Sequence, residues 1–101
     1  MLHKCAHKIN IELLGVLKEL AGKNEVSLEF QNSVVVRNIV LDLADSFSAQ
    51  FKEALIDPEL NDPRPNVLIL LNKTEIGVLD GLDTEVKNHD RLVFIPVSHG
   101  G

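Results

Sequence analysis

Cysteine is nearly absent from this chain of 101 residues, and no long apolar run occurs in it. Cys5 is the only cysteine, so no disulfide can form within the chain, and nothing indicates an oxidising compartment. The longest strongly apolar run, Val67 to Leu71, is far shorter than the roughly 18 residues of a membrane span. Asn10 and Glu12 interrupt any core of an N-terminal signal peptide. We therefore expect a cytoplasmic protein that makes no contact with a membrane.

Positive charge is also scarce. The chain carries 10 Lys and Arg against 15 Asp and Glu, which gives a formal net charge of -5 at pH 7. This balance argues against direct binding of nucleic acid, because phosphate contacts need clustered Lys and Arg. The length and the 45% hydrophobic content suit one domain with a single core. We expect that domain over residues 1–96 and a flexible tail over residues 97–101.

The first third of the chain predicts a hairpin. Apolar and polar residues alternate from Ile9 to Leu13, which indicates a half-buried strand. Apolar residues at near-helical spacing from Val16 to Ala21 indicate one short turn of helix. Alternation resumes from Val26 to Phe30 and predicts a second strand that pairs with the first.

The apolar period then changes from two to that of a helix. The spacing i, i+3, i+4, i+7, i+11 and i+15 is filled by Val36, Ile39, Val40, Leu43, Phe47 and Phe51. This spacing predicts one amphipathic helix of three turns or more, which reaches Phe51. The β-branched run from Val34 to Val36 predicts extended chain leading into that helix. Prolines between Asp57 and Pro65 predict a loop.

The second half of the chain predicts three more strands. Val67 to Leu71 is apolar on both faces, which indicates a central strand covered on both sides or lying at an interface. Ile76 to Leu79 suits a short edge strand, and Asp83 suits the cap of a helical turn over residues 83–86. The last strand is expected from Leu92 to Ile95, ending at Pro96.

Two hairpins joined by a single amphipathic helix predict a two-layer α+β domain. The helical crossover would leave the first and last strands as parallel neighbours at the centre of the sheet. This is a β-grasp architecture, with a mixed four- to five-stranded sheet and one main helix packed on one face. The chain's end would then leave from the middle of the sheet, where it can project freely.

Two glycines, Gly100 and Gly101, end the sequence. Glycine has no side chain to obstruct the backbone of another protein. It also loses more conformational entropy on ordering than other residues do, a cost that a purely structural terminus would not need. At ordinary glycine usage a given pair of positions is Gly-Gly only about 0.5% of the time. Chain ends are often small and uninformative, which is the alternative explanation.

The whole chain resembles the ubiquitin-like sulfur carriers. An acid and an apolar strand run into the diglycine from Asp90 to Gly101. The stretch from Gly15 to Gly22 resembles the small subunit of molybdopterin synthase. The ending His99-Gly100-Gly101, the strand from Val67 to Asn72 and the segment Leu79 to Asp83 are similar to the ubiquitin-related modifier of transfer-RNA thiolation.

The resemblance implies a carrier that is not itself an enzyme. An adenylating enzyme of the ubiquitin-activating type would consume ATP to activate the carboxylate of Gly101. A persulfide donor or sulfurtransferase would then attack the acyl carbon, which splits one hard step into two easier ones. The product is a C-terminal thiocarboxylate that supplies sulfur for transfer-RNA thiolation or molybdopterin synthesis. In the modifier branch the activated end instead forms an amide with a lysine of a target protein.

The resemblance also assigns roles to the rest of the tail. Gly100 would let the tail thread a narrow channel, with His99 and Ser98 beside it orienting the chain or lying in solvent. The protein would bind no cofactor of its own. Two alternatives stay open: an obligate subunit that inserts its tail into the large subunit of molybdopterin synthase, and a β-grasp binding module whose C-terminus is never activated.

A docking patch is expected on the sheet face that the helix leaves open. The family docks on its activating enzyme through this face and the tail. The candidates are Leu68, Leu70 and Phe94, with Leu92 depending on a register that the sequence does not fix.

A metal site was considered at the N-terminus, where His3, Cys5 and His7 alternate. Histidine and thiolate are zinc and copper ligands, but a site needs a fourth ligand and a rigid frame. We therefore expect no metal.

Two further groups of charged residues have structural explanations. Turn and cap chemistry accounts for four acids, Asp80, Asp83, Glu85 and Asp90. Four lysines suit ordinary surface positions: Lys23, Lys52, Lys73 and Lys87.

Overall fold

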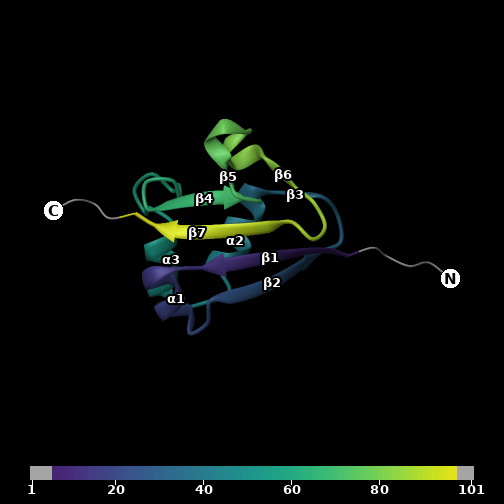
Figure 1. Ribbon diagram of the computed structural model, residues 1–101. Coiled ribbons are helices and arrows are strands. Elements are labelled where there is room, and N and C mark those ends of the chain that lie inside the picture. The colour runs from purple at the N-terminus through teal and green to yellow at the C-terminus, as the bar shows by residue number, and fades with distance from the viewer. Residues whose placement is uncertain (1–5, 98–101) are drawn as a thin grey trace.

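The first and last strands of the sheet lie side by side and run parallel at its centre (Figure 1). Asn10 pairs with Arg91 and Leu13 with Phe94. The computed structural model describes residues 6–97. Its main sheet has the order β2-β1-β7-β4-β5, made by β1 (His7–Leu13), β2 (Glu25–Phe30), β4 (Val67–Leu71), β5 (Thr74–Glu75) and β7 (Arg91–Pro96). The β-grasp prediction, including its parallel centre, is confirmed.

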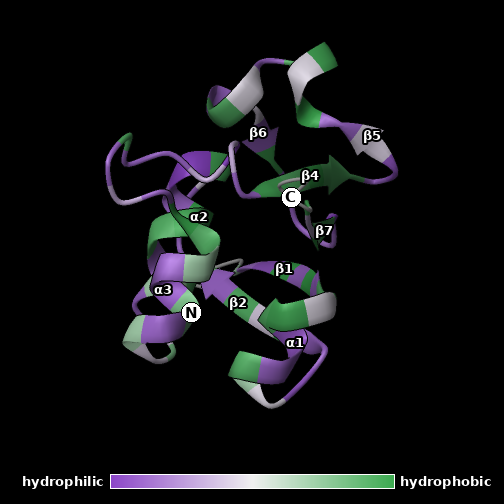
Figure 2. Ribbon diagram, turned by 90° about the vertical axis from the view of Figure 1, so that its left-hand side faces the viewer, coloured by the Kyte–Doolittle hydropathy of each residue, from purple (hydrophilic) through white to green (hydrophobic). Residues whose placement is uncertain are grey.

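Three helices and a small second sheet complete the fold. The helices are α1 (Gly15–Ala21), α2 (Val36–Ala44) and α3 (Ala49–Leu55). The second sheet pairs β3 (Val34–Val35) with β6 (Glu85–Val86), and two 3₁₀ turns cover Ile76–Val78 and Gly81–Asp83. Figure 2 shows α2 and α3 on one side of the main sheet.

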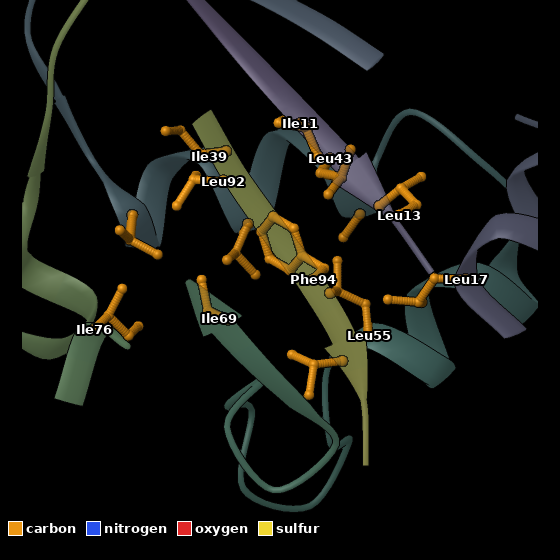
Figure 3. Close-up of a cluster of buried hydrophobic side chains, with 14 of the residues drawn as sticks. Ile11, Leu13, Leu17, Ile39, Leu43, Leu55, Ile69, Ile76, Leu92 and Phe94 are labelled. Atoms are coloured by element: carbon orange, nitrogen blue, oxygen red, sulfur yellow. The ribbon is translucent and has the colours of Figure 1, made fainter. Parts of the chain in front are cut away.

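The core lies between the sheet and these helices. Ile9, Ile11 and Leu13 are buried because alternate residues of a strand point to the same face. Phe94 of β7 is fully buried and lies within a cluster of side chains from several elements, Leu43 and Leu55 among them (Figure 3). Burial of each such side chain contributes about 1.5–3 kcal/mol, so this face of the sheet accounts for much of the stability.

The predicted single helix is wrong in length, because the chain bends between α2 and α3. The Ser48 hydroxyl accepts a hydrogen bond from the Phe51 amide at 3.2 Å and so caps a new helix. Phe47 and Phe51 nevertheless pack together, with ring centroids 4.8 Å apart. The apolar spacing therefore continues across the break, which is why it indicated a single helix.

Local predictions between residues 74 and 86 also need correction. The edge strand is β5 at Thr74–Glu75, and the predicted strand residues after it form a 3₁₀ turn. The expected helical turn over residues 83–86 is instead the end of a 3₁₀ turn followed by β6. Pairing of β6 with β3 explains the difference, since a strand partner outweighs the weak local preference for a helix. Of the run Val34 to Val36, the first two residues are extended as predicted, and Val36 begins α2.

The loop between α3 and β4 is held by two aspartates. The Asp57 carboxylate accepts hydrogen bonds from the amides of Glu59 and Leu60. The Asp62 carboxylate accepts one from the Arg64 guanidinium at 2.6 Å, and this bond lowers the pKa of Asp62 below its ordinary value.

Candidate docking face and tail root

β4 presents its two faces to different surroundings. Val67, Ile69 and Leu71 are buried against the helices, whereas Leu68 is 38% exposed and Leu70 half-buried. The prediction that both faces are covered is therefore wrong. The alternative, that the outward face of β4 lies at an interface, stays a prediction.

The pairing of β4 with β7 gathers four apolar side chains on the open face of the sheet. Leu68 lies opposite Ile95, and Leu70 lies opposite Val93. Side chains directly opposite each other on neighbouring strands lie about 4.5–5.5 Å apart at Cβ and so touch. We call these four residues, Leu68, Leu70, Val93 and Ile95, the apolar patch.

Phe94 and Leu92 do not belong to this patch. Both are fully buried and point to the helices, because the alternation of β7 places even-numbered residues on the core face. The prediction that Phe94 is a docking residue is therefore wrong, and Val93 and Ile95 hold the outward positions of β7. No alternation marks this choice in the sequence, since β7 is apolar at both odd and even positions.

The open face becomes charged on its β1 and β2 side. The Arg91 guanidinium lies 2.9 Å from a carboxylate oxygen of Glu12 and 3.3 Å from one of Glu25. These hydrogen bonds raise the pKa of Arg91 above its ordinary value. A hollow of about 330 Å³ lies at the boundary of the charged and apolar parts, lined by Glu12, Asn72, Lys73, Arg91 and Val93. A partner on this face would therefore meet an apolar strip beside one that carries both acidic and basic side chains.

The chain leaves the sheet from a fixed root beside the apolar patch. The Val97 amide donates a hydrogen bond to the Asn66 carbonyl oxygen at 3.0 Å, although Val97 is the first residue of the predicted tail. The Leu14 amide donates to the Phe94 carbonyl oxygen at 3.2 Å. The predicted tail residues Ser98, His99, Gly100 and Gly101 lie outside the described residues.

The candidate metal ligands are divided in the same way. His3 and Cys5 lie outside the described residues, and His7 lies in β1. The Nδ1 atom of His7 is buried and has no hydrogen-bond partner within residues 6–97. The described part of the chain contains no group of three or more His, Cys, Asp or Glu residues arranged to hold a metal ion.

The acids and lysines singled out in the sequence lie mostly in turns and connections, with Lys52 in α3 and Glu85 in β6. The Asp90 carboxylate accepts hydrogen bonds from the Lys87 amide at 2.7 Å and from the Asn72 side chain at 3.0 Å, as turn chemistry predicts. Asp83 pairs with Arg37 at 3.3 Å. Exposed positions hold all four lysines, Lys23, Lys52, Lys73 and Lys87. No helix within residues 6–97 is long and apolar enough to traverse a lipid bilayer.

Comparison with known proteins places this geometry in a family. The family model Urm1 (ubiquitin related modifier) matches residues 8–101. A ubiquitin-related modifier 1 homologue of Dictyostelium discoideum is 29% identical over 97 residues, covering 93% of this chain and 99% of the relative. The small archaeal modifier protein 1 of Methanosarcina acetivorans superposes with a TM-score of 0.78 at 25% identity, covering 96% of this chain and 99% of that one.

A third similarity is to the solved structure of Urm1 from Trypanosoma brucei, with a TM-score of 0.73 at 24% identity. It covers 95% of this chain and 97% of that one, which supports the shared ubiquitin-like fold. Proteins of this kind are small carriers or modifiers and are not enzymes themselves. The match over nearly the whole chain, together with the β-grasp fold, shows that this protein belongs to the Urm1 family of ubiquitin related modifiers.

Proposed function

We propose that this protein is a sulfur carrier whose C-terminal carboxylate, on Gly101, is activated and converted to a thiocarboxylate. The observation that carries the proposal is that the family match runs through residue 101 and so includes the diglycine. The apolar patch beside the root of the tail supports it, because it offers an enzyme a surface near the point from which the chain leads to Gly101.

The chemistry follows from the poor reactivity of a carboxylate toward nucleophiles. An oxygen of the Gly101 carboxylate attacks the α-phosphorus of ATP on a ubiquitin-activating-type enzyme and displaces pyrophosphate. The terminal sulfur of a persulfide then attacks the acyl carbon and displaces AMP, giving an acyl disulfide. Attack by a thiol on the other sulfur of that disulfide releases the thiocarboxylate. The carrier supplies the acid and a clear approach to it, and the partners supply the catalytic groups.

Transfer RNA is the sulfur acceptor that we propose, since the family is that of the ubiquitin related modifiers. Conjugation of the same activated end to a lysine of a target protein is a second use of one intermediate, because an amine can displace AMP as sulfur does. The acyl adenylate is common to both outcomes.

Intact mass tests the proposal directly. The protein is incubated with ATP, its host's activating enzyme and a persulfide donor. We expect the native chain to gain the mass of one sulfur less one oxygen. A chain lacking Gly101 should gain nothing, whereas a control lacking only Met1 should react as the native chain does. No gain for the native chain, while a reference carrier is thiolated by the same enzyme, would contradict the proposal.

A further inference from the structure

A groove of about 260 Å³ lies beside the root of the tail, on the side of β7 that faces the helices. It is lined by Val16 of α1, Ala54 of α3, and Asn66, Pro96 and Val97. Figure 2 looks onto this end of the molecule, with α1, α3 and the end of β7 toward the viewer. Val16 is 46% exposed and Val97 41% exposed. The groove therefore presents apolar surface to solvent on the opposite side of β7 from the apolar patch.

The walls of the groove are held in place by specific contacts. The Asn66 side-chain amide donates a hydrogen bond to the Glu53 carbonyl oxygen of α3 at 3.3 Å. The Asn66 carbonyl oxygen accepts from Val97, so one residue ties the helix to the tail root. Gly15 has φ of +56°, and a Cβ there would lie 3.3 Å from Cγ of Pro96. Glycine at this position lets α1 start close against the end of β7.

The length of the tail decides what can cover the groove. Four residues separate Val97 from the far end of Gly101, and four extended residues span at most about 14 Å. An enzyme that reacts with the Gly101 carboxyl must therefore bring its surface within that distance of Val97. A protein surface that close is near enough to contact the neighbouring groove, which Val97 helps to line.

We propose that the enzyme that activates Gly101 also inserts an apolar side chain into the groove formed by Val16, Ala54, Asn66, Pro96 and Val97. The inference rests on the proposed function, since it uses the reach of the tail to Gly101. The enzyme then holds the tail root from both sides of β7, with the apolar patch on one side and the groove on the other. Contacts on both sides fix the direction in which the tail enters the enzyme.

A charge placed in the groove tests this contact. Val16→Asp lies in the first turn of α1, where an acid is favourable to a helix, so the fold should persist. Leu41→Asp on α2 is the matched control, because Leu41 is 49% exposed and lies outside the groove. We expect Val16→Asp to raise the KM for the carrier about tenfold in ATP–pyrophosphate exchange, with kcat nearly unchanged. Leu41→Asp should leave both constants within about twofold of native, and Val16→Ile should behave as the native chain.

The outcomes separate this inference from the proposed function. If the native chain is activated and Val16→Asp matches Leu41→Asp in KM, the groove contact is overturned and the carrier function stands. If the native chain is not activated at all, the proposed function fails, and the groove contact that rests on it fails with it. Sedimentation of each variant tests whether a second copy of the chain occupies the groove instead. If the native chain is a dimer that dissociates in Val16→Asp, with KM unchanged, the groove belongs to the dimer interface and the proposal is overturned.

Discussion

The two faces of the main sheet are built from the same strands, yet they differ in what their side chains do. On the helix face, Ile11, Ile69 and Phe94 are buried almost completely and hold the layers together. On the open face, Leu68 and Ile95 form part of an apolar patch that α2 and α3 do not cover. The apolar residues of one strand therefore divide between the buried core on one face and exposed or half-buried surface on the other.

The charged half of the open face sharpens the same contrast. Glu12 and Glu25 share one partner, Arg91, across three strands. Both pairs lie at the surface, where water and salt weaken the attraction between charges, so they add little to stability. A partner that binds the open face would have to match these charges as well as the apolar patch.

The largest expected effect separates neighbouring residues of β7. Phe94→Ala should lower the free energy of unfolding by about 3–5 kcal/mol, since it leaves a cavity in the core. Ile95→Ala, one residue later on the open face, should cost about 1 kcal/mol because its side chain is only partly buried. Urea denaturation of the two variants measures the difference. Equal losses would show that the faces are not divided as described.

The next effect is on recognition. Leu68→Asp should change the free energy of unfolding by no more than about 1 kcal/mol, because the side chain is already exposed. It should raise the KM for the activating enzyme about tenfold, which corresponds to about 1.4 kcal/mol of lost binding. Leu41→Asp carries the same change on α2 and serves as the control. A KM for Leu68→Asp no higher than that of the control would remove the apolar patch from the interface.

The smallest effect concerns a residue that belongs to neither face. Asp62 has a lowered pKa in the folded state because Arg64 hydrogen-bonds its carboxylate. The folded state therefore binds this proton more weakly, so the stabilisation is present above the unfolded-state pKa and is lost as pH falls through the folded-state pKa. Asp62→Asn should cost up to about 1 kcal/mol near pH 7 and less at about pH 2. Urea denaturation at both values checks this, with the exposed Glu59→Gln as control; a cost that does not fall in acid would mean that the ion pair is not the cause.

Sequence patterns predicted the framework of this fold because one face of each of the first two strands, β1 and β2, is polar. Ile9, Ile11 and Leu13 alternate with polar residues, so the side of β1 that faces the core was evident. The bend before Ser48 was missed because Phe47 and Phe51 keep a helical spacing across it and then pack together. The Ser48 hydroxyl, which caps α3, is a weaker sequence signal for the start of a new helix than the apolar spacing is for one continuous helix.

The candidate site was predicted less completely, for a related reason. β4 and β7 are apolar at successive positions, so alternation does not say which residues face outward. Pairing of Leu68 with Ile95 decides that question, and it depends on contacts between segments far apart in the sequence. The tail root was missed as well, since the bond between Val97 and Asn66 joins residues that carry no motif.

The position of β7 links the root of the tail, at Val97, to completion of the fold. This strand is central in the sheet, yet it is the last one along the chain. Asn10 of β1 can therefore pair with Arg91 only after nearly the whole chain has been synthesised. During synthesis β1 and β2 emerge from the ribosome long before the strand that joins them to β4. A chain that ends before β7 therefore has neither a complete sheet nor the hydrogen bond that anchors Val97. An enzyme that recognises this anchored segment would bind the complete domain and not such a fragment.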